Sequence, residues 1–245
     1  MNRKLNIYAM IPARFGSTRL KLKNMALINS KPMISYSIDA ALESNIFKKV
    51  VVNSDHSVFK DIADRHGVDF YLRPPDLASS LAKSDSVVFD FIVKYPEADI
   101  VVWVNPIAPL QNAKDIDEVV NYFIANNYDS LISTEKKQVH SMYLGEPVNF
   151  KINESFSQTQ DIEPIEIFSY SLMMWKSKEF AKEFKEKGFG LFCGNFGTKD
   201  SGKLAGFIIK TDEDLFIADA ILRGNALGKT AQKVQYDDVA HKYLI

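Results

Sequence analysis

Short apolar runs alternate with segments of helical periodicity along the first half of the chain. The runs at residues 7–13, 49–55, 69–72 and 100–104 are of the kind found in strands, and two of them are apolar almost throughout, which is typical of strands buried in parallel sheets. Helical spacing follows each run, at residues 32–42, 57–66, 85–95 and 114–126. This alternation predicts an α/β fold with right-handed crossovers and a mostly parallel sheet.

The second half of the chain is less regular. We expect a strand at residues 129–135, a half-buried strand at 168–175, where large apolar residues alternate with serines, and a helix at 176–187. Between the two strands, residues 136–166 are polar and lack clear periodicity. The whole chain is interpreted as one domain, with residues 136–166 as an inserted arm.

Polar side chains follow four of the predicted strands at the points where the strands end: Arg14, Asp55, Arg73 and Asn105. Because open α/β sheets bind ligands at the carboxyl ends of their strands, we expect these side chains to gather at one edge. Neither a Gly-x-Gly-x-x-Gly nor a Gly-x-x-x-x-Gly-Lys-Ser/Thr pattern follows the first strand, which makes a dinucleotide dehydrogenase or a P-loop enzyme a poor interpretation.

The loop after the first strand carries candidate chemistry for binding an anion. Gly16 and Ser17 offer backbone donors, and four cations lie within ten positions: Arg14, Arg19, Lys21 and Lys23. A triphosphate fits this description. The alternative is a solvated basic loop after an edge strand.

This region resembles the first loop of the acylneuraminate cytidylyltransferases, the CMP-sialic acid synthetase family. The matching positions are Ala13, Arg14, Ser17, Lys23 and Asn24, whereas residues 17–20 are closer to the sister family that makes CMP-Kdo. The resemblance implies a Rossmann-like nucleotidyltransferase (GT-A-like) sheet flanked by helices, with a small dimerisation arm. It also implies a reaction that joins CMP from CTP to an acidic keto sugar and releases pyrophosphate.

Residues 72–84 resemble the family segment that binds cytosine, which implies that Arg73 and Ser84 contact the base. An arginine can donate to the acceptors that distinguish cytosine. The alternative for Arg73 is a surface ion pair with Asp69 or Asp76. The resemblance further implies that Arg14 and Lys23 bind the triphosphate and stabilise the transition state. Ala13, Ser17 and Asn24 would complete the nucleotide site.

The acceptor side departs from the family pattern. In residues 104–111, Asn105 replaces a longer glutamine, Ile107 and Ala108 replace hydroxyl residues, and Gln111 replaces an arginine. We expect altered sugar recognition, with Asn105 as a substrate-binding residue.

Residues 136–166 occupy the place of the family's dimer arm. Within them, residues 159–164 resemble the segment that reaches the neighbouring subunit, so the resemblance implies a homodimer with Gln160 in the partner's sugar site. The alternative is a polar surface excursion without a function. Residues 168–175 lack the Asn and Gly of the family's strand.

The family's two magnesium-binding aspartates align with Ile208 and Lys210. Thr211 and Asp214 are retained, but a threonine followed three positions later by an acid is also a helix start. We assign no metal ligand. Three interpretations stay open: magnesium arrives mainly on the nucleotide, Lys210 supplies positive charge itself, or catalysis has been lost and binding kept.

Composition agrees with this interpretation. The 245 residues are 46% hydrophobic and carry a net charge of -1, which gives a sizeable core and argues against a nucleic-acid partner. The single cysteine, Cys193, is expected to be a small buried side chain. The basic start followed by an apolar run is not a signal peptide, since it ends in Pro12, and no stretch is long enough for a membrane span. We therefore expect a cytoplasmic protein whose partners are CTP and an acidic sugar. The alternatives are a non-catalytic nucleotide-binding relative, or a cytidylyltransferase for Kdo-like or phosphonate substrates.

Overall fold

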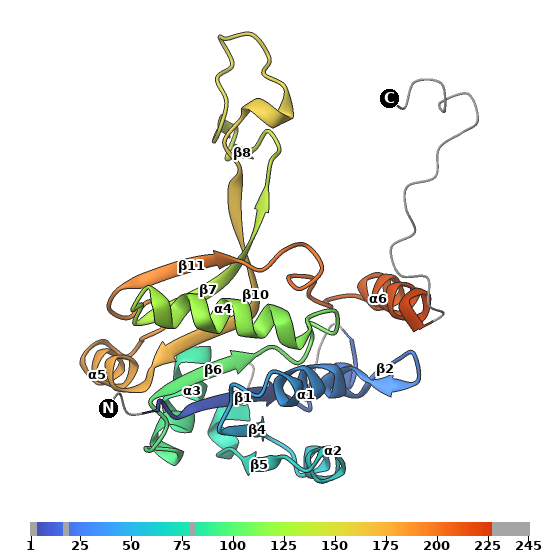
Figure 1. Ribbon diagram of the computed structural model, residues 1–245, viewed down its shortest axis with the longest axis vertical. Helices are drawn as coiled ribbons and strands as arrows, with labels where there is room; N and C mark the ends of the chain where they lie inside the picture. The colour runs from blue at the N-terminus through green and yellow to red at the C-terminus, as the bar shows by residue number, and fades with distance from the viewer. Residues whose placement is uncertain (1–3, 17–19, 79–81, 227–245) are drawn as a thin grey trace.

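A seven-stranded sheet forms the centre of the computed structural model, which describes residues 4–16, 20–78 and 82–226. The strand order is β11-β7-β10-β6-β1-β4-β5, and within this sheet only β10 runs antiparallel to its neighbours (Figure 1). The strand bounds are β1 Ile7–Ala13, β4 Lys49–Ser54, β5 Asp69–Leu72, β6 Ile100–Val104, β7 Ser130–Lys137, β10 Ile165–Lys176 and β11 Phe196–Asp200. The predicted mostly parallel α/β sheet is confirmed.

Helices cover both faces of the sheet. One face packs against α1 (Met33–Glu43), α2 (Val58–His66) and α4 (Ala113–Ala125), and the other against α3 (Ser84–Lys94) and α5 (Ser177–Lys187). The alternation of β1 shows how one strand supplies both layers. Ile7, Ala9 and Ile11 belong to the first core, whereas Tyr8 and Met10 belong to the second. A strand buried on both faces explains the continuous apolar runs in the sequence.

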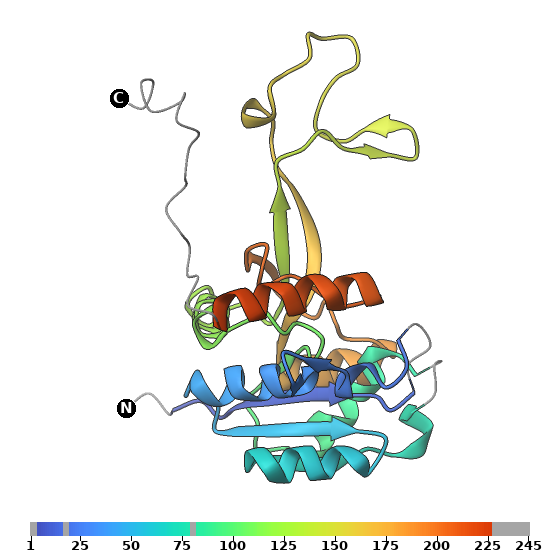
Figure 2. The ribbon, with the colours of Figure 1, turned by 90° about the vertical axis from the view of Figure 1, so that its right-hand side faces the viewer.

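A third, smaller core lies beside the first loop. The short strands β2 (Leu27–Ile28) and β3 (Lys31–Pro32) pair as a hairpin, and Ile28 packs with Met33, Ile209 and Ala218. Ala218 lies in α6 (Asp212–Ala226), the last helix of the described chain (Figure 2). The 206–210 segment is thereby held near the loop that follows β1.

Strand β10 differs from its expected half-buried character. Its residues from Ser171 to Trp175 are all buried, because β10 faces both cores: Leu172 and Met174 pack in the first, and Met173 and Trp175 in the second. The serines that suggested a solvent face are buried with Ser133 of β7. The Oγ of Ser133 lies 2.8 Å from the Oγ of Ser169 and 3.1 Å from that of Ser171. Hydroxyls that satisfy one another can be placed inside a core.

Residues 138–164 project from the body between β7 and β10 (Figure 1). They include a short hairpin, β8 (Met142–Tyr143) with β9 (Glu146–Pro147), and a single 3-10 turn at Thr159–Asp161. This is the stretch in which the sequence showed no periodicity. Strand β10 runs antiparallel to both β6 and β7, so β7 points in the same direction as the parallel strands. The projection follows the end of β7 and therefore starts from the edge where the parallel strands end. No helix in the described ranges is long and apolar enough to cross a membrane.

Candidate active site at the carboxyl edge of the sheet

The strands β1, β4, β5 and β6 run parallel, so their carboxyl ends meet at one edge of the sheet, here called the carboxyl edge. Arg14, Asp55, Arg73 and Asn105 directly follow these strands. Asp55 links three of the strand ends: its Oδ1 accepts a hydrogen bond from the N–H of Phe15 at 2.8 Å and lies 3.8 Å from Nη2 of Arg73. The gathering expected from strand order is therefore present.

Arg73 is the most constrained of these side chains. Its side chain is only 4% exposed, and the carboxylate of Asp55 is 7% exposed. Nε of Arg73 is buried and has no hydrogen-bond partner among the residues that the structure describes. Burial lowers the pKa of Arg73, although the Asp55 charge opposes this shift. The alternative of a surface ion pair with Asp69 or Asp76 is wrong, because Arg73 is buried beside Asp55, and Asp69 instead pairs with Lys49 at 2.8 Å.

A second buried polar group near Arg73 was missed by the sequence reasoning. Asp90 of α3 accepts a hydrogen bond from the hydroxyl of Tyr71 at 3.2 Å, and its other carboxylate oxygen, Oδ2, is buried without a partner in the described part of the chain. Burial raises the pKa of Asp90, and the bond from Tyr71 only partly offsets this. A buried donor on Arg73 and a buried acceptor on Asp90 that no described residue pairs are what a polar ligand would satisfy. No motif signalled Asp90, because its position in α3 fits an ordinary helix pattern.

The first loop is held by its own residues and by a distant segment. Ala13 is fully buried at the end of β1, and Asn24, 6% exposed, donates from Nδ2 to the carbonyl of Arg14 at 3.2 Å. Nζ of Lys23 donates to the carbonyl of Ile209 at 3.1 Å. Ser17, also expected in the nucleotide site, lies outside the described residues. Lys23 thus ties the basic loop to the segment that contains Ile208 and Lys210.

That segment does not fit a protein-held magnesium ion. Ile208 offers no ligand, and the exposed Lys210 directs its backbone N–H to Oδ2 of Asp214 at 2.8 Å. Among the described residues, no three Asp, Glu, His or Cys side chains are grouped in a way that could hold a metal. Asp214 accepts from the N–H of Thr211 at 2.9 Å, and its own N–H donates to Oγ1 of Thr211 at 3.2 Å. The predicted helix start is confirmed, and these two residues serve the beginning of α6.

The acceptor side shows why its residues depart from the family pattern. Asn105 has both amide atoms engaged: Nδ2 donates to the carbonyl of Tyr170 at 2.9 Å, and Oδ1 accepts from the N–H of Ile107 at 3.3 Å. Ala108 is fully buried, and Ile107 packs against the small third core. Gln111 is 4% exposed, and neither of its amide atoms has a partner in the described ranges. Ile107 therefore packs beside the 206–210 segment, and its carbonyl accepts a hydrogen bond from the N–H of Ile209 at 2.9 Å.

The two remaining expected site residues, Ser84 and Gln160, lie in different parts of the structure. Ser84 is the first residue of α3, and the start of this helix is anchored because Asp85 accepts from the N–H groups of Gly190 at 2.7 Å and Leu191 at 3.0 Å. Gln160 is exposed on the arm, which projects away from the body (Figure 1), so a single chain does not bring Gln160 to the other site residues.

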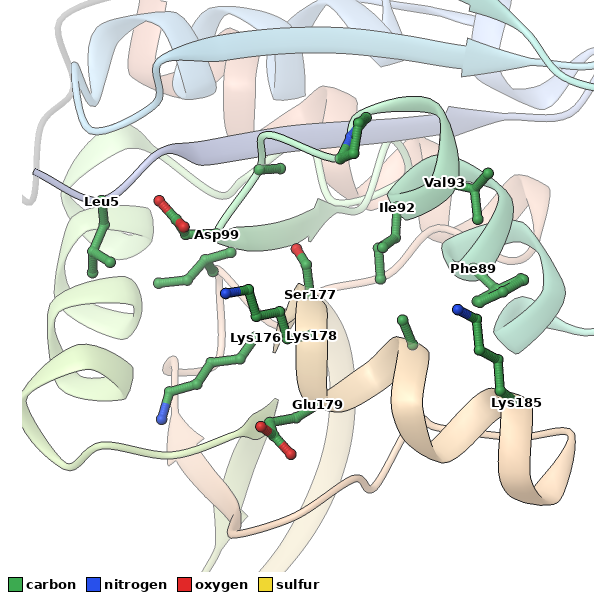
Figure 3. A pocket seen from close by; sticks show the side chains of 14 residues that line it. Leu5, Phe89, Ile92, Val93, Asp99, Lys176, Ser177, Lys178, Glu179 and Lys185 are labelled. Carbon is green, nitrogen blue, oxygen red and sulfur yellow. The ribbon is translucent and has the colours of Figure 1, made fainter.

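An apolar groove elsewhere in the described part of the molecule is not part of this site. It has a volume of about 440 Å³ and lies between α3 and α5, lined by residues such as Leu5, Phe89, Val93 and Ser177 (Figure 3). Leu5 precedes β1 and Ser177 follows β10, so the groove lies at the opposite edge of the sheet from Arg14 and Arg73.

An open, mostly parallel sheet with a basic loop after its first strand makes the chain an α/β protein with a candidate ligand site at the carboxyl edge. The family model described as "Cytidylyltransferase" matches residues 8–184, so the chain belongs to the cytidylyltransferase family. The family resemblance of the sequence motifs is thereby confirmed. Cys193 is buried as expected, and burial raises the pKa of its thiol to about 12.

Similar proteins agree with this membership. The N-acylneuraminate cytidylyltransferase of Escherichia coli O18:K1:H7 is 32% identical over 142 residues, which cover 58% of this chain and 34% of the relative. The CMP-N,N'-diacetyllegionaminic acid synthase of Legionella pneumophila is 34% identical over 121 residues, covering 47% of this chain and 52% of the relative. The aligned part is thus about a third to a half of these relatives' length. In fold, the chain is similar to a CMP:2-keto-3-deoxy-manno-octonic acid synthetase complexed with CTP, with a TM-score of 0.68, 14% identity, and coverage of 90% of this chain and 99% of that one.

Proposed function

We propose that this protein transfers CMP from CTP to an acidic keto sugar of the nonulosonate type and releases pyrophosphate. The observation that carries the proposal is the buried Arg73, whose Nε has no partner among the described residues and lies at the edge of the sheet that also holds the basic loop. A buried cationic donor without a partner is costly unless a ligand satisfies it. Family membership supports the nucleotide, and the names of the similar proteins support the class of acceptor.

In the proposed reaction, the anomeric hydroxyl oxygen of the sugar attacks the α-phosphorus of CTP. A bond forms between this oxygen and phosphorus, the bond to the bridging oxygen of the β-phosphate breaks, and pyrophosphate leaves with the electron pair. The hydroxyl proton passes to solvent. Arg14 and Lys23 bind the triphosphate and stabilise the negative charge that develops in the transition state. Ala13, Ser17 and Asn24 shape the loop around the phosphates and ribose.

The base is proposed to lie over the ends of β4 and β5. Arg73 would donate to the ring acceptors of cytosine, and Ser84 at the start of α3 would supply a hydroxyl. On the acceptor side, Asn105 acts through the backbone of β10, to which its amide is bonded. Gln160 would reach the acceptor site of a second subunit, so we propose a homodimer in which the arm crosses between copies.

Magnesium is proposed to enter on the nucleotide, because the positions of Ile208 and Lys210 do not provide ligands. This feature also favours a second candidate function, a nucleotide-binding protein that has lost catalysis. The two functions differ in one product. A catalyst releases pyrophosphate only when CTP and an acceptor are both present, whereas a binding protein is stabilised by CTP and releases none.

The test is a pyrophosphate-release assay on the purified full chain with CTP and a panel of acidic acceptors: a nine-carbon nonulosonate, a diacetylated nonulosonate, the eight-carbon Kdo and a phosphonate. Lys23→Ala serves as the site variant and Lys182→Ala, on the exposed side of α5, as the matched control. The proposal expects release with at least one sugar, reduced by Lys23→Ala and unchanged by Lys182→Ala. Thermal stabilisation by CTP without any release would support the binding protein instead.

A further inference from the structure

Tyr170 of β10 has a backbone conformation that a bulky side chain rarely adopts. Its φ is +57°, in the left-handed region, and the pairing of β10 with β7 shifts register between Phe168 and Met173 around it. This is a bulge at the point where β10 enters the sheet from the arm. Steric repulsion of the Cβ atom opposes a positive φ, and such residues concentrate where a side chain has to be directed to a particular place.

Core burial does not compensate for this conformation, since Tyr170 is 46% exposed. Its ring meets that of Phe168 edge to face, with 5.7 Å between the centroids, and nearly half of the residue's surface remains exposed. Completing the strand requires neither an aromatic ring nor a positive φ at this position. The combination points to a ligand that uses the ring.

The surrounding polar groups hold the bulge in place. Nδ2 of Asn105 donates to the carbonyl of Tyr170 at 2.9 Å, and the N–H of Asn105 donates to the carbonyl of Ser171 at 3.0 Å. On the other side, Oγ of Ser133 accepts from the N–H of Leu172 at 2.9 Å. Backbone groups that the bulge removes from the regular ladder are therefore paired by side chains from β7 and from the loop after β6.

The order of strands indicates which part of a substrate Tyr170 faces. The phosphate-binding loop follows β1, and Arg73 follows β5, with β4 between them. On the other side of β1 lie β6 and β10, and Leu172 is paired with Val104, the last residue of β6. With the triphosphate at β1 and the base toward β5, the acceptor must approach from β6 and β10. Tyr170 lies at that end.

From these observations we propose that Tyr170 forms an aromatic wall of the acceptor half of the site and selects acceptors that present an apolar face, such as the C–H face of a deoxy sugar ring or an acyl methyl group. Asn105 is the positioning residue that holds this wall. The inference rests on the proposed function. The exposed aromatic face, with a phenolic hydroxyl at its tip, suits a ligand that is apolar on one side and polar at its rim.

The test measures steady-state kinetics with the best acceptor from the panel for the unchanged protein, Tyr170→Gly and Tyr170→Phe. Glycine adopts positive φ without steric repulsion, so Tyr170→Gly keeps the bulge and removes the ring. The matched control is Asn45→Gly, which also places glycine at a positive φ (+55°) but lies in the loop before β4, at the opposite edge. We expect Tyr170→Gly to raise the acceptor KM about tenfold or more, from the loss of one aromatic contact face.

The KM for CTP and the melting temperature should stay unchanged in Tyr170→Gly, and Tyr170→Phe and Asn45→Gly should both keep the acceptor KM within about twofold. Asn105→Ala alone should raise the acceptor KM. Combined with Tyr170→Gly, it should raise the acceptor KM little beyond the value for Tyr170→Gly alone. That non-additivity is expected of a positioning residue and not of an independent contact.

Failure of this inference is distinguishable from failure of the proposed function. If the unchanged protein turns over no acceptor, the proposed function is wrong, and the inference falls with it. If the unchanged protein turns over an acceptor and Tyr170→Gly has the same acceptor KM, only the role of Tyr170 is wrong. A changed sedimentation coefficient in Tyr170→Gly with an unchanged acceptor KM would assign the residue to a subunit interface and overturn the proposal.

Discussion

Replacing Arg73 alone and together with Asp55 separates binding from stability at the proposed base site. The two side chains are almost fully buried, and their charged atoms lie 3.8 Å apart. Arg73→Met leaves the Asp55 carboxylate buried with the N–H of Phe15 as its main donor. Breaking a buried pair on one side costs about 3 kcal/mol or more of unfolding free energy. The 3.8 Å separation is longer than a hydrogen bond, so we expect the low end of that range.

The double variant Asp55→Asn with Arg73→Met removes both charges. Replacing a whole buried pair by neutral groups of similar volume is often close to neutral, so its unfolding free energy should return to within about 1 kcal/mol of the unchanged protein. Binding of CTP should not return. Loss of a hydrogen bond from a charged donor costs about 1.5–3 kcal/mol, which is about a 10- to 100-fold weaker Kd in both variants.

The assays are urea denaturation for stability and calorimetric titration with CTP for binding. Recovery of stability without recovery of affinity is the result that the reasoning requires. If the double variant binds CTP as tightly as the unchanged protein, Arg73 is only an ion-pair partner of Asp55, and the base site has to be sought elsewhere.

Three other predictions concern the loop, the buried acid and the metal. Lys23→Ala should weaken CTP binding while changing the unfolding free energy by only about 1 kcal/mol. A circular dichroism spectrum showing that this variant is unfolded would mean that Lys23 has a structural role instead. Burial raises the pKa of Asp90, so the ionisation of this carboxyl opposes folding as the pH rises. Asp90→Asn should therefore raise the unfolding free energy near neutral pH and lose this gain below about pH 4, as urea denaturation at a series of pH values would show. Because Ile208 cannot ligate and Lys210 carries a positive charge, we expect the chain itself to hold no magnesium ion, so EDTA should hardly weaken CTP binding. Strong magnesium dependence in calorimetry would show that other groups hold the ion, and Ile208→Asp with Lys210→Asp should create that dependence.

The parallel core could be predicted from sequence because its strands are buried on both faces, which leaves continuous apolar runs such as residues 100–104. Strand β11 could not, since it is short and carries Gly197, Lys199 and Asp200 in an edge position. Hydrogen bonding to β7 makes this segment a strand, although its own sequence has no strand-like pattern. Gly197 has a packing reason that only the structure shows, because a Cβ there would lie 2.6 Å from the ring of Tyr128.

In the candidate site, too, some features could be predicted from the sequence and others could not. The predicted strand ends placed Arg14, Asp55, Arg73 and Asn105 at one edge, because the order of strands along the chain is enough to place residues at one edge of a parallel sheet. The individual contacts that these residues make were not predictable. Asp55 meets Arg73 because β4 and β5 are neighbours, and Asp90 comes from a helix with no distinguishing pattern. Such contacts depend on side-chain burial, which periodicity does not specify.

Binding selectivity among nucleoside triphosphates tests the central claim, that the carboxyl edge is a cytidine triphosphate site. The measurement is calorimetric titration of the purified full chain with CTP, UTP, ATP and GTP under identical conditions. A site that hydrogen-bonds a polar edge of the base rejects a base whose donors and acceptors are exchanged, since buried groups such as Nε of Arg73 would remain unpaired. We predict that CTP binds at least about tenfold more tightly than UTP and more tightly again than the purine nucleotides. Equal affinity for all four nucleotides, or no binding of CTP, would contradict the assignment.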